Sequence, residues 1–398
     1  MKKKLMILGA SILQLPAIIE AKKLDLDVIV CDMDPNAIGF KESGIVREYV
    51  STIDTKRILE VAKSYKINGI MTLATDLPMR SVAAVCKYMN LVGIGEDTAF
   101  KATNKYAMRE ALKEHNVPIP DFYKASNYKE FLETVDKFKL SFIVKPADNS
   151  GSKGVCLVEK KTSEEQLLKI YEYSHSYSRN GDVVIEEYMN GPEVSVETIS
   201  FNGKCNIIQI TDKLTTGAPY FVEMGHSQPS NLDKGILKEI EKVTVDANKA
   251  IGIEIGPSHT EIIVTKEGPK IVELGARLGG DNITTHLVPL STGVNLVNAC
   301  IKIALNQEPD IIFKFKKGSA IRYFKQKQGI IKRIEGLDKA NKIQGIKQIS
   351  VVHGEGDKLT EINCSGARMG FVIAQAETAN KAIDICESAI NKISVVME

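Results

Sequence analysis

Two glutamates and an arginine lie close together in residues 260–281, TEIIVTKEGPKIVELGARLGGD. Two short runs of alternating β-branched residues flank a turn that ends in Gly268, which is typical of a β-hairpin. This register places Glu261 opposite Glu273, with Cβ atoms roughly 5 Å apart. Facing carboxylates need a compensating cation, and their oxygens suit Mg²⁺ that also binds substrate phosphates. A solvated hairpin face with an ordinary arginine at position 277 is the alternative.

The pattern of the N-terminal residues predicts a sheet that precedes this hairpin in the chain. Short apolar runs alternate with helical patterns, which indicates a parallel sheet with right-handed crossovers. Gly9 stands alone where the fingerprint G-x-G-x-x-G needs three glycines, which argues against a nicotinamide dinucleotide. We expect Asp32 and Asp76, at the polar ends of these strands, to face a ligand site. The apolar runs are residues 5–8, 28–31 and 69–74, with helices expected over 12–24 and 78–89.

A small-residue loop, DNSGSK at 148–153, separates two expected strands at 142–145 and 155–158. The backbone N–H groups of such a loop can close over phosphate oxygens, and Lys145 and Lys153 add positive charge. A flexible hairpin tip is the alternative interpretation. The pattern G-x-x-x-x-G-K-[ST] is absent, which excludes P-loop chemistry.

Lys105 lies in the first turn of a helix expected over 103–116. The helix dipole favours an anion at that position, so this lysine gains a function only if an anionic ligand lies nearby. Otherwise it is surface decoration.

A buried strand at 183–189, VVIEEYM, runs into two carboxylates. In a purine clamp, the backbone of residues 187–189 would meet the adenine edge and Glu193 a ribose hydroxyl. A strand with a solvated end is the alternative. Farther on, Glu223 and His226 lie in FVEMGHSQPS, which predicts an irregular segment whose side chains could hold a substrate amine or carboxylate.

The bulk composition is that of an ordinary globular protein, with 398 residues, 43% hydrophobic and 26% charged residues and a formal charge of +2. This balance predicts neither nucleic-acid nor membrane partners. The seven cysteines are scattered without a C-x-x-C pair, which favours reduced thiols in the cytoplasm over disulfides or a zinc site. In the C-terminal part, we expect residues 366–370 to form a turn between strands with Arg368 exposed, and a ligand-facing loop is the alternative.

Taken in order, these motifs resemble the ATP-grasp enzymes, above all the branch of the L-amino acid ligases, biotin carboxylase and glycinamide ribonucleotide synthetase. The resemblance implies an α/β and α+β fold with a parallel βαβ domain at 1–95, an ATP-grasp domain at 96–310 and a small α+β lobe at 311–398. The lid subdomain would span about 120–190. It further implies ATP and Mg²⁺, with Mn²⁺ as a substitute, small carboxylate and amine substrates, and a homodimer.

The resemblance also implies a role for each candidate residue. ATP phosphates would be held by Lys105 and Lys145 and covered by the loop of Ser150, Gly151, Ser152, Lys153 and Gly154. Adenine would meet Glu186, Glu187, Tyr188 and Met189, and the ribose Glu193. The metal would be bound by Glu261 and Glu273, the reacting intermediate stabilised by Arg277, and the substrates bordered by Glu223, His226, Gly279 and Gly280.

One position departs from the carboxylases, which carry an asparagine two residues after the second metal carboxylate, where this chain has Gly275. The expected reaction is therefore the joining of a carboxylate to an amine through an acyl phosphate, with release of ADP and phosphate. Two rivals are a phosphoribosylamine–glycine ligase, which needs a phosphosugar site near Gly9, and a regulator that binds ATP without chemistry.

Overall fold

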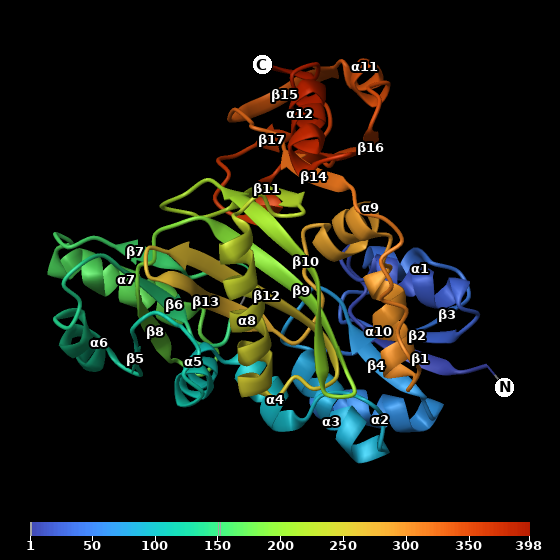
Figure 1. Ribbon diagram of the computed structural model, residues 1–398, viewed down its shortest axis with the longest axis horizontal. Helices are drawn as coiled ribbons and strands as arrows, with labels where there is room; N and C mark the ends of the chain where they lie inside the picture. The colour runs from blue at the N-terminus through green and yellow to red at the C-terminus, as the bar shows by residue number, and fades with distance from the viewer. Residues whose placement is uncertain (1, 150, 152) are drawn as a thin grey trace.

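A parallel sheet begins the computed structural model, which describes residues 2–149, 151 and 153–398 (Figure 1). Its order is β3 (Ile45–Glu48), β2 (Asp27–Cys31), β1 (Lys4–Leu8) and β4 (Gly69–Thr72). The helices are α1 (Leu15–Lys23), the 3-10 helix η1 (Ile38–Lys41), α2 (Thr55–Tyr65) and α3 (Met79–Met89). In β1, Leu5 and Ile7 lie in one buried cluster and Met6 and Leu8 in another. Both faces of the sheet are therefore apolar, and the predicted parallel βαβ arrangement is confirmed.

A small antiparallel sheet follows and lies on the left of Figure 1. Helices α4 (Glu96–Thr103) and α5 (Lys105–Glu114) lead into it. Its order is β5 (Phe122–Ala125), β8 (Val183–Glu187), β6 (Phe142–Pro146) and β7 (Cys156–Val158). Helices α6 (Tyr128–Val135) and α7 (Glu164–Ser176) pack on it. Phe131, Phe142 and Tyr171 belong to a hydrophobic cluster of its own, so this sheet can hold its shape independently of its neighbours.

An eight-stranded sheet occupies the centre of the molecule (Figure 1). Five neighbouring strands are β13 (Gly268–Gly275), β12 (Gly256–Thr265), β9 (Glu193–Phe201), β10 (Lys204–Thr215) and β11 (Glu223–Gln228). The C-terminal part of the chain adds β14 (Gly318–Tyr323), β18 (Gly370–Ala376) and β16 (Ile346–Val351). Helix α8 (Lys234–Ile251) packs against the β12–β13 hairpin. The C-terminal residues thus extend the sheet that carries the candidate site.

The remaining C-terminal elements lie at the top of Figure 1. A three-stranded sheet has the order β17 (Lys358–Leu359), β15 (Gly329–Glu335) and β19 (Ser394–Met397). Its helices are α11 (Leu337–Asn341), the 3-10 helix η3 (Ser365–Ala367) and α12 (Ala379–Ile390). The segment between β13 and β14 of the central sheet contains the π-helix η2 (Ile283–Leu287), α9 (Val288–Thr292) and α10 (Leu296–Ala304), and α10 lies lower in Figure 1, packed against α1 and β4. Helix α12 packs on β14 and β18, which joins this α+β lobe to the central sheet.

One hydrophobic cluster connects the N-terminal sheet to the central sheet. It contains Met6 of β1, Val82 of α3, Ile240 of α8 and Leu274 of β13. Burial of one such side chain contributes roughly 1.5–3 kcal/mol, so a shared core of this kind fixes the two sheets relative to each other. The ends of the parallel strands are thereby held in a fixed position relative to the β12–β13 hairpin.

Two expectations about local structure were wrong, and strand β3 was missed. Residues 223–228 form strand β11 and not an irregular segment, because these polar residues are paired between β10 and β14. Strand β3 was not predicted, since its four residues include two that are exposed. Arg368 is buried and not exposed, because the turn that carries it folds against Asp281 and Tyr323.

In the part of the chain that the structure describes, no single helix is long and apolar enough to cross a membrane. By length and composition alone, the pair Ile283–Thr292 and Leu296–Ala304 meets the criterion together, with a bend of 113° between its halves.

Candidate active site

The two glutamates of the hairpin face each other as predicted. Glu261 of β12 pairs with Glu273 of β13, and a register shift follows between Glu261 and Ile262. Each carboxylate contacts a lysine, with 2.8 Å from Lys105 Nζ to Glu273 Oε1 and 3.3 Å from Lys213 Nζ to Glu261 Oε1. The repulsion between the two carboxylates is therefore balanced by ammonium groups from two other elements.

A cavity opens between the small antiparallel sheet and the hairpin. It encloses about 900 Å³, the open space at its mouth included. Most of the predicted nucleotide and metal residues line it: Lys105, Lys145, Gly151, Lys153, Glu186, Glu187, Tyr188, Met189, Glu193, Glu261 and Glu273. Glu223 lines it as well. Ser150 and Ser152 lie outside the described residues. Gly154 has φ +77°, and a Cβ there would lie 2.7 Å from Pro146, so this position requires glycine.

Two cations share one buried carboxylate at the floor of this cavity. Arg109 donates to Glu186 at 2.8 and 3.0 Å, and Lys145 Nζ lies 2.7 Å from Glu186 Oε2. Burial opposes the charge on Glu186, but the two cations outweigh it and lower its pKa to about 2. Burial also lowers the pKa of Lys145, and Arg109 and Lys105 lower it further. The group therefore has one positive charge in excess, which suits an anionic ligand.

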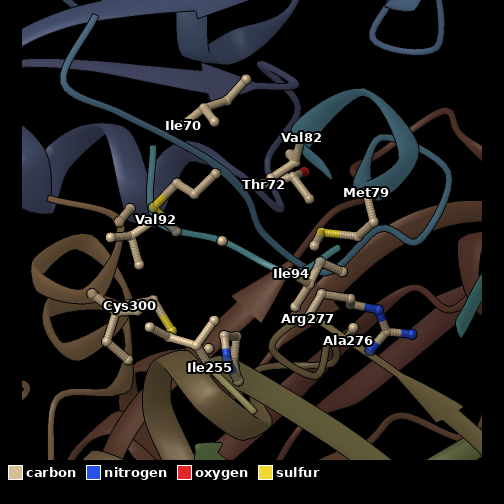
Figure 2. Close-up of a pocket in the computed structure, with 16 residues that line it drawn as sticks. Ile70, Thr72, Met79, Val82, Val92, Ile94, Ile255, Ala276, Arg277 and Cys300 are labelled. Carbon is tan, nitrogen blue, oxygen red and sulfur yellow. The ribbon is translucent and has the colours of Figure 1, made fainter. Parts of the chain in front are cut away.

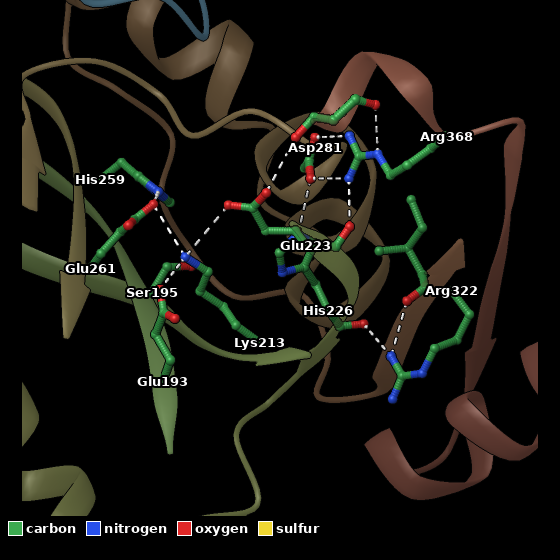
Figure 3. A network of polar contacts seen from close by, with 12 residues as sticks. Glu193, Ser195, Lys213, Glu223, His226, His259, Glu261, Asp281, Arg322 and Arg368 are labelled. Carbon is green, nitrogen blue, oxygen red and sulfur yellow. Dashed lines mark hydrogen bonds and ion pairs between the residues drawn. The ribbon is translucent and has the colours of Figure 1, made fainter. Parts of the chain in front are cut away.

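Lys213 is the centre of a second buried charge cluster, drawn in Figure 3. Its ammonium binds Glu193 and lies 3.3 Å from Glu261 and 3.9 Å from Glu223. Burial alone would lower its pKa, but the three carboxylates outweigh burial and raise it. Burial raises the pKa of Glu193. With three carboxylates around one ammonium, this end of the cavity is acidic, whereas the Lys145 end is basic.

His259 links Glu261 to a second carboxylate, that of Glu197, through its two ring nitrogens. Its Nδ1 lies 2.6 Å from Glu197 Oε1 and its Nε2 lies 3.2 Å from Glu261 Oε1. Burial would lower the pKa of His259, but Glu197 and Glu261 outweigh burial and raise it to about 9. Burial would likewise raise the pKa of Glu261, yet Lys213 and His259 hold it well below its usual range. Glu261 is thus fixed in place and ionised.

Arg277 lies outside the cavity of the lysines and extends from β13 toward the N-terminal sheet. Its Nε and Nη2 donate to Asp76 at 2.8 and 3.0 Å. Its stem borders a mostly apolar pocket between the two sheets, which Ile70, Met79 and Ile255 also line (Figure 2). The predicted polar strand end at Asp76 is therefore linked to Arg277.

The predicted substrate residues lie beside the acidic end. His226 is buried in β11, and its Nε2 lies 3.4 Å from Asp281 Oδ2 (Figure 3). Gly279 has no room for a side chain, because a Cβ there would lie 2.6 Å from His259 Nδ1. At Gly280, a Cβ would meet Ala74 at 3.7 Å. Gly279 therefore allows the chain to pass close to His259, whereas Gly280 has room for a small side chain.

The donor atoms at the hairpin fit a hard divalent cation. Glu261 and Glu273 supply carboxylate oxygens, the ligands that Mg²⁺ prefers, and Mg²⁺ commonly completes its shell with water and phosphate oxygens. Among the described residues, no group of three or more His, Cys, Asp or Glu side chains is placed to hold a metal. The two glutamates and a bound polyphosphate would together be needed.

Sequence reasoning did not find Arg109 or Lys213. Arg109 occupies an ordinary position in a charged helix, and its partner Glu186 is 77 residues away. Lys213 lies in β10, a strand with several polar residues. A charged side chain that becomes buried requires a partner, but the local sequence around either residue does not identify that partner.

Comparisons with known proteins agree with this geometry. A model of the ATP-grasp domain matches residues 138–285, and a model of the L-amino acid ligase C-terminal domain 2 matches residues 322–398. The L-arginine-specific L-amino acid ligase of Bacillus subtilis is 25% identical over 332 residues, which cover 81% of this chain and 79% of that protein.

Two solved structures share the fold. The L-amino acid ligase from Bacillus licheniformis matches with a TM-score of 0.86 at 21% identity, covering 100% of this chain and 99% of the other. Phosphoribosylglycinamide synthetase from Anaerococcus prevotii matches with a TM-score of 0.79 at 23% identity, covering 100% of both chains. At these identities the likeness concerns the fold alone.

Proposed function

We propose that this chain, which matches a model of the ATP-grasp domain over residues 138–285, is a ligase that joins a carboxylate to an amine at the expense of ATP. One observation carries the proposal: Glu261 lies opposite Glu273, and both line the same cavity as Lys105 and Lys145. Paired carboxylates for a metal and paired lysines for phosphates are the parts that phosphoryl transfer needs.

We assign the phosphates of the nucleotide to the basic half of the cavity and its ribose to the edge of the acidic end. Lys105 and Lys145 bind the phosphates, and the loop that contains Gly151, Lys153 and Gly154 covers them. The backbone of residues 187–189 meets the adenine, and Glu193 meets the ribose. Supporting this assignment, the Lys145 group has an excess positive charge. Glu193 is bound to Lys213, so a ribose hydroxyl would share that contact.

Glu261 and Glu273 would hold Mg²⁺, which would supply positive charge beside the terminal phosphoryl group of ATP. Binding of the metal would require Lys105 and Lys213 to weaken their ion pairs with Glu273 and Glu261. Lys105 lies on the phosphate side, so it can exchange Glu273 for a phosphate oxygen without a large movement. His259 keeps Glu261 oriented during this exchange.

The reaction begins when a carboxylate oxygen of the acid attacks the terminal phosphorus of ATP, which breaks the bond to ADP. The product is an acyl phosphate. The amine then attacks its carbonyl carbon, phosphate leaves, and the amine proton is lost. Arg277 stabilises negative charge on the transferred phosphoryl group and on the tetrahedral adduct. Closure of the small antiparallel sheet excludes water, which would otherwise hydrolyse the acyl phosphate.

We assign the substrates to the acidic end. Glu223 carries the negative charge that a substrate ammonium needs, and His226, Gly279 and Gly280 form the neighbouring wall. The support is electrostatic, because three carboxylates surround the single ammonium of Lys213. The ammonium group of a free amino acid has the complementary charge.

Phosphoribosylamine–glycine ligase is the second candidate, since the chain shares the fold of phosphoribosylglycinamide synthetase. The loop after β1 opposes it. Ala10 N–H donates to Asp32 at 2.7 Å, and Ser11 N–H donates to Gln14 Oε1 at 3.2 Å. Gln14 also covers Gly9, where a Cβ would lie 2.7 Å from its Cδ. The backbone donors that could hold a phosphate are thus already used, and Asp32 would repel it.

Three wider assignments belong to the same proposal. The domains divide at about residues 95 and 310, the protein works in the cytoplasm, and it forms a homodimer. The cytoplasmic assignment is supported by the seven cysteines, which have no disulfide partner in the described chain.

A phosphate-release screen tests the function. Purified protein with ATP and Mg²⁺ should release phosphate in the presence of pairs of free amino acids. Release with phosphoribosylamine and glycine, but not with amino acid pairs, would establish the second candidate instead. Binding of ATP without turnover in either mixture would indicate a regulator.

A further inference from the structure

Arg368 brings the C-terminal lobe into contact with the acidic end of the cavity. It lies between η3 and β18, and its Nη1 and Nη2 donate to Asp281 at 2.7 and 2.8 Å. Nη1 also donates to the carbonyl oxygen of Glu223 at 2.9 Å, and Nε to the carbonyl oxygen of Ser365 at 2.9 Å. Its Cζ lies 3.7 Å from the centre of the Tyr323 ring. The guanidinium is therefore held on several sides (Figure 3).

These contacts neutralise the charge of one acidic residue, Asp281, more fully than that of another, Glu223. Asp281 accepts both charge-assisted bonds from Arg368 and faces His226, so its charge is already neutralised. Glu223 has weaker partners, since its carboxylate lies 3.9 Å from Lys213 and accepts one hydrogen bond of 3.3 Å from Ser365 Oγ. Lys213 lies closer to Glu193 and Glu261. Glu223 is thus the carboxylate whose charge remains available to a ligand.

We propose that Arg368 is a positioning residue through which the C-terminal lobe holds Glu223 in place for a substrate ammonium group. This inference rests on the proposed function and assigns a task to the lobe. The guanidinium fixes the start of β11 through the Glu223 carbonyl, while Ser365, three residues earlier in the same turn, fixes the Glu223 side chain. A single turn of the lobe therefore controls both the backbone and the carboxylate of Glu223.

The substitution Arg368→Lys distinguishes this positioning role from a role that depends on the positive charge alone. Arg368→Lys keeps the positive charge but cannot span Asp281 and the Glu223 carbonyl with a planar fork. We expect the apparent KM for the amino acid to rise about tenfold, as for the loss of one bidentate contact. The KM for ATP and the kcat at saturating amino acid should stay within about twofold, because Arg368 does not line the nucleotide cavity.

The experiment uses the full chain with ATP, Mg²⁺ and an equimolar mixture of the twenty protein amino acids, and follows ADP release against total amino acid. The variants are Arg368→Lys, Glu223→Gln and the double variant. Arg333→Lys is the matched control, because Arg333 is an exposed arginine of the same lobe that contacts Glu335. If Arg368 acts through Glu223, the double variant has the same KM as Glu223→Gln alone.

Additive effects of the two substitutions, or an unchanged amino acid KM in Arg368→Lys, would overturn the inference while leaving the proposed function intact. No ADP release by the wild-type protein would remove both. Should Arg368→Lys not fold, the neutral pair Arg368→Gln with Asp281→Asn takes its place, with the same rise in KM expected. Thermal unfolding of each variant identifies this case.

Discussion

The carboxylate of Asp76 binds the guanidinium of Arg277 through two hydrogen bonds across 201 residues of sequence. A Cβ on Gly275 would lie 2.7 Å from Asp76 Oδ1 and 3.2 Å from the Arg277 guanidinium. Gly275, the position that departs from the carboxylases, is therefore the residue that leaves room for this ion pair. The loop after β4 thereby orients the arginine that we assign to the reaction.

Gly275→Ala tests this dependence. The methyl group must displace the Asp76 carboxylate, so Arg277 loses its orientation, and we expect kcat to fall about tenfold or more with little change in the KM for ATP. Steady-state ADP release measures it. Gly366→Ala is the control, because a Cβ there has no neighbour closer than 4.0 Å. Full activity in Gly275→Ala would mean that Asp76 does not need its present position.

Arg277→Ala addresses the arginine itself. We expect a folded protein that binds ATP but loses at least ~100-fold in kcat, the usual effect of removing a donor to a developing charge. Calorimetry with a non-hydrolysable ATP analogue and Mg²⁺ checks binding, and ADP release checks turnover. An unchanged kcat would remove Arg277 from the mechanism.

The sequence predicts local relationships well. Glu261 and Glu273 are joined by one tight turn, so the turn composition was sufficient to establish that they face each other. The alternation of apolar runs likewise predicted the parallel sheet, because the hydrophobic period records which faces are buried.

Contacts between segments that are distant in the chain could not be predicted from the sequence. Arg109 with Glu186, Lys213 with Glu261 and Arg368 with Asp281 depend on how separate elements pack, and no local pattern specifies them. Strand β11 was missed for a related reason, since its polar side chains are satisfied by partners from other strands and from the lobe.

Lys213→Met should destabilise the protein. It leaves Glu193, Glu261 and Glu223 facing one another without their cation, and loss of one partner from a buried pair typically costs about 3–5 kcal/mol. Urea unfolding measures the free energy of unfolding. Lys204→Met, at an exposed position in the same strand, should change it by less than about 0.5 kcal/mol. Equal effects of the two substitutions would refute the cluster's importance for stability.

Glu186 predicts a dependence of stability on pH. Its pKa falls from 4.5 to about 2 in the folded protein, so its contribution is present above pH 4.5 and is lost as pH falls toward 2. That contribution is on the order of 3 kcal/mol. Urea unfolding between these pH values should show a smaller loss in Glu186→Gln than in the wild type, because Glu261, whose pKa is also held low, contributes to the loss in both proteins. The exposed Glu377→Gln is the control, and an identical pH dependence in Glu186→Gln and the wild type would contradict the assignment.

The most direct measurement is ADP and phosphate release with ATP, Mg²⁺ and free amino acids, by the wild type and by Glu273→Gln. The wild type should release ADP and phosphate in equal amounts and only when an amino acid is present, whereas Glu273→Gln should lose Mg²⁺-dependent release because one of the two facing carboxylates is gone. Retained turnover by Glu273→Gln at ordinary Mg²⁺, or release of AMP and pyrophosphate in place of ADP, would contradict a ligase built on this pair of glutamates.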